Sequence, residues 1–205
     1  MTMTTLKAMA LAVTFTIASG NVHASQNSSQ CVFDFTPQQL STMATAYHTG
    51  KTQDLGYTLA AISWRESRAG EDVVSMGGSL KAANLGAFQN KVKTVGDREG
   101  CKSRKCYANV GVKLLVNQEY AAKAALDEMN FWLDYHNKNV RKSLSSYNAG
   151  FARNSSSNSY AADVVKKAKY LQRCVSFVSI PKSPKVDPAV LAMNKRTIDK
   201  LKRAQ

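Results

Sequence analysis

Acidic side chains are scarce in this 205-residue chain, which has 14 Asp and Glu against 28 Lys and Arg. The formal charge is therefore +14, and a surface of that sign concentrates near polyanions. The chain also lacks a zinc-finger spacing, an RNA-binding signature and a strand pattern of alternating basic and aromatic residues. We therefore expect no nucleic-acid partner, although charge alone does not choose among the other polyanions.

No apolar run in the chain is long enough to span a membrane. The N-terminal run AMALAVTFTIA has 11 residues, follows Lys7 and precedes VHA, where small residues occupy the −3 and −1 positions of a cleavage site. This pattern predicts a secretory signal peptide at residues 1–24, and the alternative is a membrane anchor that stays attached. We therefore expect an exported protein of the periplasm or cell envelope, with charge +13 once Lys7 is removed.

Cysteine and histidine are also few, with four and three residues. No two cysteines have CxxC spacing and no histidine lies near a cysteine, so zinc is the weaker alternative and no cofactor is predicted. An even number of cysteines in an oxidising compartment favours disulfides. We favour Cys101–Cys106, which would close a short basic loop, and Cys31–Cys174, which would join the two ends of the domain. The other two connectivities stay open.

Strand-forming segments are rare, and CVSFVSIP at residues 174–181 is the one β-like run. Thr36 and Pro37 are typical of the start of a helix, which Gly50 would end. Apolar spacing and end signals predict further helices at residues 55–70, 110–136, 140–150, 160–173 and 187–205, and an irregular glycine-bearing loop at residues 71–90. The predicted fold class is all-α.

The C-terminal segment carries a strong excess of positive charge. PKSPK is typical of a linker, and from Lys182 onward there are seven Lys or Arg against two Asp. We predict a domain at residues 25–178, followed by a linker and basic helical tail at residues 179–205. The tail is either a solvated helix folded back on the domain or a dock for a cell-envelope machine or an anionic membrane surface.

One predicted helix places an acid where its own spacing calls for an apolar residue. In LGYTLAAISWRESRAG, apolar residues from Leu55 to Ile62 follow helical spacing, and the next inward position is Glu66. Burial and the negative end of the helix dipole both raise the pKa of such a carboxyl, as a general acid requires, while Arg65 and Arg68 lower it. The alternative is a Glu that pairs with a nearby Arg.

Four short motifs follow in order along the chain: ES at residues 66–67, NLGAFQ at 84–89, SYNAG at 146–150 and YAADV at 160–164. Their succession resembles the soluble lytic transglycosylase family, enzymes of lysozyme-like α-helical fold that cut bacterial peptidoglycan. The resemblance covers residues 55–171. It implies a lysozyme-like transglycosylase domain with an irregular groove-lining loop, whose partner is the peptidoglycan glycan strand.

The resemblance also implies roles for individual residues. Glu66 is the implied catalytic acid, and the implied substrate-binding residues are Ser67, Gly86, Phe88, Gln89, Tyr147, Asn148 and Tyr160. Gly86 and Gln89 match the outer positions of the family's GLMQ motif, whose glutamine lies along the sugar groove, while Ala87 and Phe88 depart from it and keep an apolar wall.

Two tyrosines complete the implied site. Tyr147 matches the tyrosine of the family's AYNAG motif, which places the catalytic carboxylate or binds the reacting sugar, and Tyr160 matches an aromatic residue that lines the groove. Ordinary loop and cap hydrogen bonding is the alternative for Gln89 and Asn148. The two tryptophans, Trp64 and Trp132, are expected in the core rather than as sugar platforms.

The motifs supply one carboxylate, whereas glycoside hydrolysis ordinarily takes two. Glu71, Asp72 and Asp97 are candidates for a second, and none lies in a motif. The resemblance implies a lyase route that needs Glu66 alone and ends in a 1,6-anhydro product. The alternatives are a muramidase that uses Asp72 or Asp97, and a non-catalytic wall-binding assembly protein.

Overall fold

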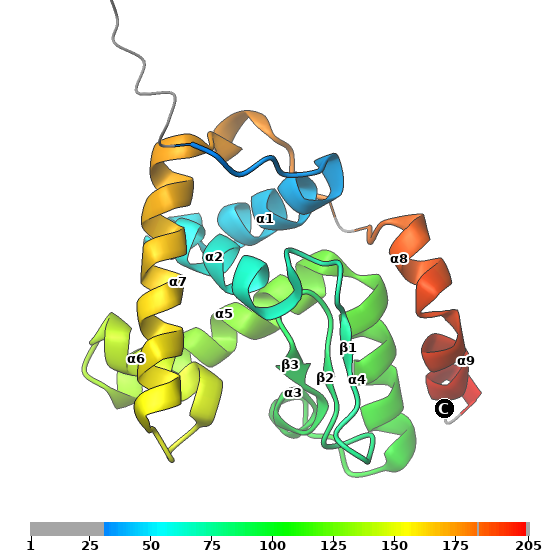
Figure 1. The fold of residues 1–205 in the computed structure, drawn as a ribbon. Coiled ribbons are helices and arrows are strands. Elements are labelled where there is room, and N and C mark those ends of the chain that lie inside the picture. Colours follow the sequence, from blue (N-terminus) through cyan, green and yellow to red (C-terminus); the bar gives the residue numbers. More distant parts are fainter. Residues whose placement is uncertain (1–30, 184, 204–205) are drawn as a thin grey trace, which may run out of the picture. The chain divides into compact units, whose positions relative to one another are not determined.

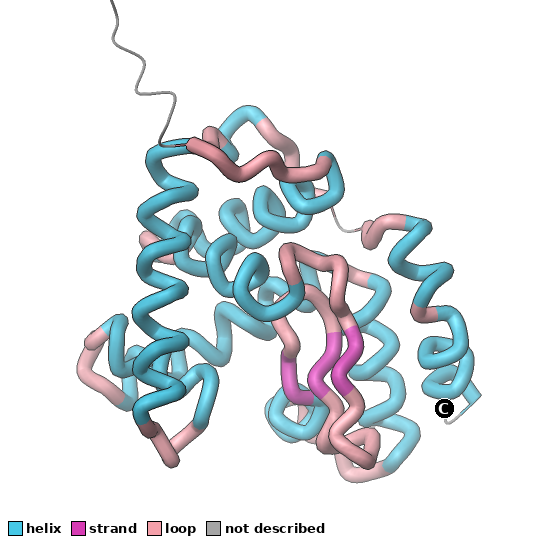
Figure 2. Tube along the Cα trace, viewed as in Figure 1, coloured by secondary structure: helices cyan, strands magenta, loops and turns pink. Residues whose placement is uncertain are grey.

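The computed structural model describes residues 31–183 and 185–203, so the predicted signal peptide at residues 1–24 lies outside the described residues. Residues from Phe33 onward form one compact unit (Figure 1). Helices make up most of it, which confirms the all-α class at this level (Figure 2). The α-helices that precede the tail are α1 Pro37–Gly50, α2 Gly56–Ser67, α3 Val92–Arg98, α4 Arg104–Val116, α5 Gln118–Tyr135, α6 Val140–Ala149 and α7 Ser155–Cys174.

Helix α1 begins where the sequence predicts. The Thr36 Oγ1 atom accepts a hydrogen bond from the Gln39 backbone N–H, and the Gln39 side chain accepts one from the Thr36 N–H, which makes a capping box with Pro37 in the first turn. The helix ends at Gly50 as predicted, and the 3₁₀ helix η2, Lys51–Gln53, leads into α2.

Helix α2 ends earlier than the glycine signal suggests. Arg68 and Ala69 both adopt left-handed backbone conformations, with φ of 53° and 58°, and the Ala69 N–H donates to the Ser63 carbonyl oxygen at 2.9 Å. The end predicted for the helix at residues 55–70, with Gly70 as its last residue, was therefore wrong, because two non-glycine residues already make the left-handed turn. This turn leaves Glu66 in the last turn of the helix.

A small antiparallel sheet follows α2, in the stretch predicted to be irregular. Its strands are β1 Val74–Ser75, β2 Asn84–Leu85 and β3 Asn90–Lys91, in the order β1-β2-β3. Leu85 pairs with Val74 on one side and with Asn90 on the other. The predicted β-like run at residues 174–181 instead contains the 3₁₀ helix η3, Phe177–Ser179. Strands of two residues are too short to show alternation in a sequence.

The long helix predicted at residues 110–136 is interrupted at Asn117. Its backbone is extended there (φ −130°, ψ 104°), and its Oδ1 atom accepts a hydrogen bond from the Tyr120 N–H, so it ends α4 and caps α5. Helix α7 begins at Ser155 rather than near residue 160, because Asn154 forms a capping box with Ser157. The predicted polar loop is thus partly helical.

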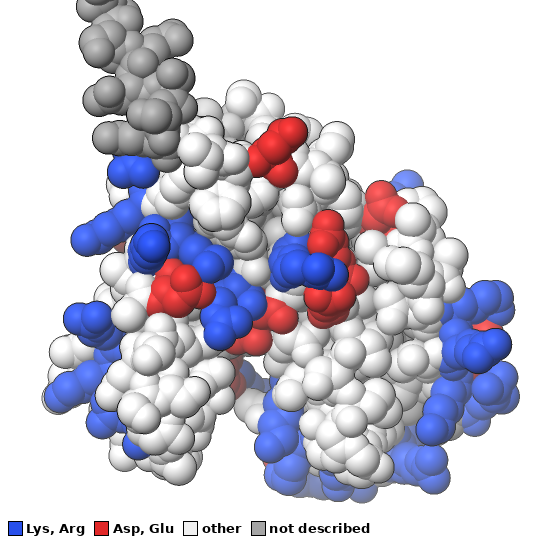
Figure 3. All heavy atoms as spheres, viewed as in Figure 1, with Lys and Arg blue, Asp and Glu red and all other residues white. Residues whose placement is uncertain are grey.

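Helix α2 packs against α1 and α7, and α6 packs against both α5 and α7. The tail also belongs to this unit: α8, Pro188–Met193, and α9, Lys195–Arg203, fold back so that α9 packs on α4 with Ile198 and Leu201 buried. Basic residues of α9 remain on the surface, where Figure 3 shows Lys and Arg gathered. The tail helix is thus folded back on the domain, and its role as a dock stays a prediction.

The predicted Cys101–Cys106 disulfide is present, just before and within the first turn of α4. Cys31 and Cys174 are disulfide-bonded as well, and their pairing with each other stays a prediction. None of the helices within residues 31–183 and 185–203 is both long and apolar enough to cross a membrane.

Candidate active site

Glu66 lies at the carboxyl end of α2, on the same stripe as Leu59 and Ile62. Those two side chains are completely buried, whereas Glu66 is half-buried and borders a cleft. Its Oε1 atom accepts a hydrogen bond of 2.6 Å from the hydroxyl of Tyr160 on α7. The apolar stripe therefore continues into a carboxyl that is fixed at one oxygen and borders the cleft.

Burial raises the pKa of Glu66 above its usual value, because a charged carboxylate is poorly solvated in this position. The hydrogen bond from Tyr160 and the charge of Arg65 lower the pKa, but less strongly. Arg65 forms an ion pair with Asp163 at 3.0 Å, and Arg68 pairs with acids beyond the helix end. Both Arg65 and Arg68 are thus paired with acids other than Glu66. This argues against the alternative in which Glu66 is a simple ion-pair partner.

The two motif tyrosines have different surroundings, and it is Tyr160 that departs from what the resemblance implies. Tyr160 is 4% exposed and holds the Glu66 carboxyl, so it is a positioning residue rather than a groove-lining aromatic, which corrects that assignment. Tyr147 on α6 borders the cleft, and its hydroxyl donates to the Phe88 carbonyl oxygen at 3.2 Å. Burial, followed by the charge of Glu66, raises the pKa of both phenols, so both remain protonated donors.

Ser67 and Phe88 do not reach the cleft with their side chains. Ser67 and Phe88 are each 1% exposed. The Ser67 Oγ donates to the Ala87 carbonyl oxygen at 2.7 Å and accepts from the Gly70 N–H at 2.8 Å. Ser67 therefore ties the end of α2 to the turn between β2 and β3, and Phe88 anchors that turn in the core, while substrate binding at these two residues stays a prediction.

Gly86 is required by the backbone of the same turn. Its φ is +79°, and a Cβ atom added there would lie 2.4 Å from the Leu114 carbonyl oxygen. This close approach fixes the turn on α4, away from the cleft, so Gly86 also supports the wall rather than touching a ligand.

Gln89 and Asn148 do border the cleft, as the motifs suggest. Gln89 closes the turn with a left-handed φ of 47°, and its Nε2 atom donates to the carbonyl oxygens of Asp72 and Gly86. Strained backbone at a non-glycine residue is retained where the surroundings over-determine it. Here the Gln89 amide is fixed by two hydrogen bonds within the loop. The alternative in which Gln89 makes ordinary loop hydrogen bonds therefore describes part of its role.

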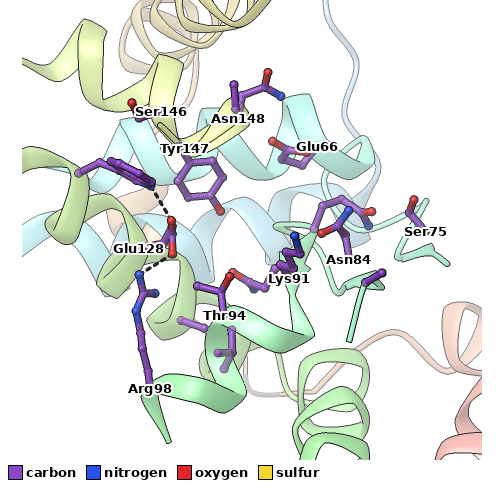
Figure 4. A pocket seen from close by; sticks show the side chains of 18 of the residues that line it. Glu66, Ser75, Asn84, Lys91, Thr94, Arg98, Glu128, Ser146, Tyr147 and Asn148 are labelled. Carbon is purple, nitrogen blue, oxygen red and sulfur yellow. Dashed lines mark hydrogen bonds and ion pairs between the residues drawn. The ribbon is translucent and has the colours of Figure 1, made fainter. Parts of the chain in front are cut away.

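The cleft has a volume of about 800 Å³ and is lined by residues from α2, the three strands, α3, α5 and α6. Figure 3 shows it as a notch in the surface, and Figure 4 shows Glu66, Tyr147 and Asn148 at one side of it and Arg98 and Glu128 at another. Most of its lining side chains can donate or accept hydrogen bonds: Glu66, Ser75, Asn84, Gln89, Asn90, Lys91, Thr94, Arg98, Glu128, Trp132, Ser146, Tyr147 and Asn148.

The three candidates for a second carboxylate are not among the residues that line this cleft. Arg68 forms ion pairs with Glu71 and with Asp72, at 3.2 and 2.9 Å. Asp97 accepts from Lys93 and from the Tyr107 hydroxyl, and the hydrogen bond from Lys93 is the main reason that its pKa is lowered. A lowered pKa makes a carboxylate a weaker base.

Glu128 is the cleft carboxylate that sequence reasoning missed. Its Oε1 accepts from Trp132 Nε1 and its Oε2 pairs with Arg98 Nη2, both at 2.5 Å (Figure 4). A signal was available, because Ala124, Glu128 and Trp132 recur every four residues along α5. Trp132 is 4% exposed, so the core prediction holds for most of its surface, yet it also lines the cleft.

No three His, Cys, Asp or Glu side chains within the described parts of the chain are grouped so that they could hold a metal ion. The chemistry that these described residues supply is a carboxyl of raised pKa, two protonated phenols and a set of amides and hydroxyls. Such a set can transfer a proton to a polar, neutral ligand held in the cleft.

Comparison with known proteins identifies one relative but does not show a family. No family model matches the chain, and no solved structure matches it. The "uncharacterized 20.7 kDa protein in vs-regB intergenic region" of Enterobacteria phage T4 is 33% identical over 118 residues, a match that covers 58% of this chain. The chain spans about 63% of the length of that phage protein, to which it is similar over this region.

Proposed function

We propose that the protein is a peptidoglycan lytic transglycosylase, in which Glu66 is the catalytic acid and base. The observation that carries this proposal is the way in which the four motifs meet. Three hydrogen bonds link them: Tyr160 to Glu66, Ser67 to the Ala87 carbonyl, and Tyr147 to the Phe88 carbonyl. Motifs 94 residues apart in sequence are thus assembled around one carboxyl of raised pKa.

The lining of the cleft suits a glycan. Amide and hydroxyl side chains such as Asn84, Asn90 and Thr94 can pair with sugar hydroxyls and acetamido groups, and Asn148 lines the same cleft as Glu66. A neutral, highly hydroxylated ligand gains many such bonds without requiring a compensating charge. The substrate that we propose is the β-1,4 bond between N-acetylmuramic acid and N-acetylglucosamine.

The proposed reaction uses one carboxyl twice. Protonated Glu66 donates its proton to the glycosidic oxygen, the bond from that oxygen to C1 breaks, and the acetamido group of the muramic acid residue stabilises the positive charge at C1. The Glu66 carboxylate then accepts the proton of the C6 hydroxyl, and the C6 oxygen bonds to C1. The products are a 1,6-anhydro sugar and a free 4-hydroxyl, and no water is consumed.

We further propose that the enzyme acts in the periplasm or cell envelope and opens the wall locally for a secretion, conjugation, pilus or phage apparatus. The phage T4 relative favours a phage apparatus among these. The basic face of α9 is the surface that we propose for contact with such a machine or with an anionic membrane.

A muramidase is the second candidate, and Glu128 is the observation that favours it. Among the described residues that line the cleft, Glu66 and Glu128 are the two acids. Both of its oxygens are already bonded, to Trp132 and Arg98, so it is better placed to hold those side chains than to activate water. A non-catalytic wall-binding protein is the third candidate, and it would keep the cleft without the proton transfer.

Mass spectrometry of purified sacculi after digestion separates these candidates. A lytic transglycosylase releases anhydromuropeptides, whereas a muramidase releases products with reducing ends. Glu66→Gln should abolish release while circular dichroism stays unchanged, because an amide cannot donate the proton. Asp72→Asn is the matched control, since Asp72 is an exposed acid paired with Arg68, and it should retain full activity.

Glu128→Gln tests the muramidase directly. If Glu128 only positions Arg98 and Trp132, the variant should cleave more slowly and give the same anhydro products. Complete loss of cleavage in this variant, together with reducing-end products from the parent, would replace our proposal by a hydrolase. Binding to sacculi with no fragments released by the parent protein would favour the non-catalytic candidate.

A further inference from the structure

Helix α5 carries a second stripe besides the one that faces the core. The core stripe includes Ala125 and Met129, which are completely buried. The other stripe holds Glu128, Phe131, Trp132 and Tyr135, at relative positions i, i+3, i+4 and i+7, so these side chains share one face of the helix. Phe131 and Tyr135 are 45% and 57% exposed.

A fourth aromatic ring reaches this face from the connection between α6 and α7. Gly150, with φ of +64°, turns the chain after α6, and the next residue, Phe151, is 69% exposed. The Phe151 ring centre lies 4.9 Å from that of Trp132 and 5.3 Å from that of Tyr135. We name Phe131, Trp132, Tyr135 and Phe151 the aromatic ridge.

The aromatic ridge continues the candidate active site. Trp132 and Phe151 both line the cleft that contains Glu66, whereas Phe131 and Tyr135 extend the same surface outward along α5. Glu128 holds the Trp132 indole through its Nε1 atom, and Arg98 lies over the Phe131 ring at 5.8 Å. Trp132 and Phe131 thus have polar partners, and the exposed ring surface of the ridge belongs to Phe131, Tyr135 and Phe151, since Trp132 is 4% exposed.

We propose that the aromatic ridge is a glycan-binding subsite, which holds sugar residues of the strand beyond the bond that is cleaved. Sugar rings present C–H groups on their faces and hydroxyls at their edges. Aromatic faces carry a negative quadrupole that attracts such C–H groups, and the edge of the ridge offers Glu128 and Arg98 for the hydroxyls. The identity of the strand as peptidoglycan rests on the proposed function, but the recognition of a sugar polymer does not.

The position of Phe151 favours this ligand over a protein partner. Its exposed ring is packed edge-on against the Trp132 and Tyr135 rings, at interplanar angles of 72° and 78°, which keeps the rings at an angle to one another at the cleft mouth. A linear polymer that occupies the 800 Å³ cleft can contact this ring, since Phe151 and Trp132 form part of the lining.

The test is a binding titration with N-acetylglucosamine hexamer, in the Glu66→Gln background of the mature chain so that nothing is cleaved. Phe151→Ala and Tyr135→Ala remove exposed rings, so the fold should be retained. Covering one such ring contributes about one factor of ten in affinity, so each variant should raise the calorimetric Kd about tenfold. Val178→Ala is the matched control, because Val178 is 73% exposed on η3 and lies outside the ridge, and its Kd should not change.

The outcomes separate this inference from the proposed function. If the hexamer binds and Phe151→Ala weakens it tenfold, the ridge is a glycan subsite even where the parent protein releases no muropeptides. If the parent releases anhydromuropeptides and Phe151→Ala leaves Kd unchanged, the inference is overturned while the proposed function stands. A change in the sedimentation coefficient of Phe151→Ala with unchanged Kd would also overturn it, because the ridge would then be a contact between proteins.

Discussion

The hydrogen bond from Tyr160 to Glu66 can be removed without disturbing the packing around it. Tyr160 is 4% exposed, and Tyr160→Phe keeps the ring volume while deleting the hydroxyl that lies 2.6 Å from Glu66 Oε1. The variant therefore isolates one charge-assisted bond between α7 and the end of α2.

A hydrogen bond to a charged group contributes about 1.5–3 kcal/mol to the free energy of unfolding. Glu66 borders the cleft, so water can replace the lost donor, and we expect the lower end, about 1.5 kcal/mol. In a chain of this size that corresponds to a fall in Tm of about 3–6 °C. The loss should be larger above the pKa of Glu66, since the bond is stronger to the ionised carboxylate.

The same substitution should move the pH dependence of activity in a defined direction. The Tyr160 bond lowers the pKa of Glu66, so removing it raises that pKa further. If Glu66 donates a proton, the pH above which the cleavage rate falls should shift upward in Tyr160→Phe. The assay is the rate of muropeptide release across pH, with Tm measured by circular dichroism at the same pH values.

Two results would refute this reasoning. A downward shift of the alkaline limb would mean that the Tyr160 hydroxyl does not stabilise the ionised carboxylate. An equal fall in Tm at acidic and neutral pH would mean that the bond does not depend on the charge of Glu66.

Three further predictions concern stability. The pKa of Glu66 is higher in the folded protein than in the unfolded chain, so the protein loses stability as pH rises from the unfolded pKa through the folded pKa. Urea unfolding should therefore find Glu66→Gln more stable than the parent at neutral pH and equal to it at acidic pH. Gly86→Ala, whose Cβ would lie 2.4 Å from the Leu114 carbonyl, should lower the free energy of unfolding by more than about 2 kcal/mol, and a smaller loss would mean that the turn can move. Replacing Cys101 and Cys106 by Ser removes a cross-link over a sequence separation of five and should cost about 2 kcal/mol, measured by urea unfolding against the parent with its disulfides intact.

Helix signals that act within a few residues could be read from the sequence. The Thr36–Pro37 start of α1 and the Gly50 end follow from local chemistry, and both are observed. The interruption at Asn117 could not be read with the same certainty, because apolar spacing continues through it and only the cap bond to Tyr120 reveals the break. The three short strands depend on pairing between residues up to 11 apart, which periodicity does not report.

The order of motifs predicted which segments meet, but not what each side chain does there. Gly86, Ser67 and Phe88 serve the wall of the cleft, since their environment is set by contacts with Leu114, Ala87 and the core that no local pattern encodes. Glu128 was accessible in principle, as a charge on the outward stripe of a helix. It was missed because it lies in no motif and because the default interpretation of such a charge is solvation.

Tyr160 is buried and bonds Glu66 instead of lining the groove, and this position matters for a mechanism that uses one carboxyl. A group that first donates and then accepts a proton needs a pKa close to the working pH, because a value far above it makes a poor acid and one far below leaves it unprotonated. Burial beside Leu59 and Ile62 raises the pKa of Glu66, and the Tyr160 hydroxyl opposes that shift. A buried tyrosine therefore limits the shift, which a solvent-exposed ring in the groove could not do. On this argument Tyr160 sets the pH range in which Glu66 is protonated, whereas Tyr147 and Gln89 border the cleft.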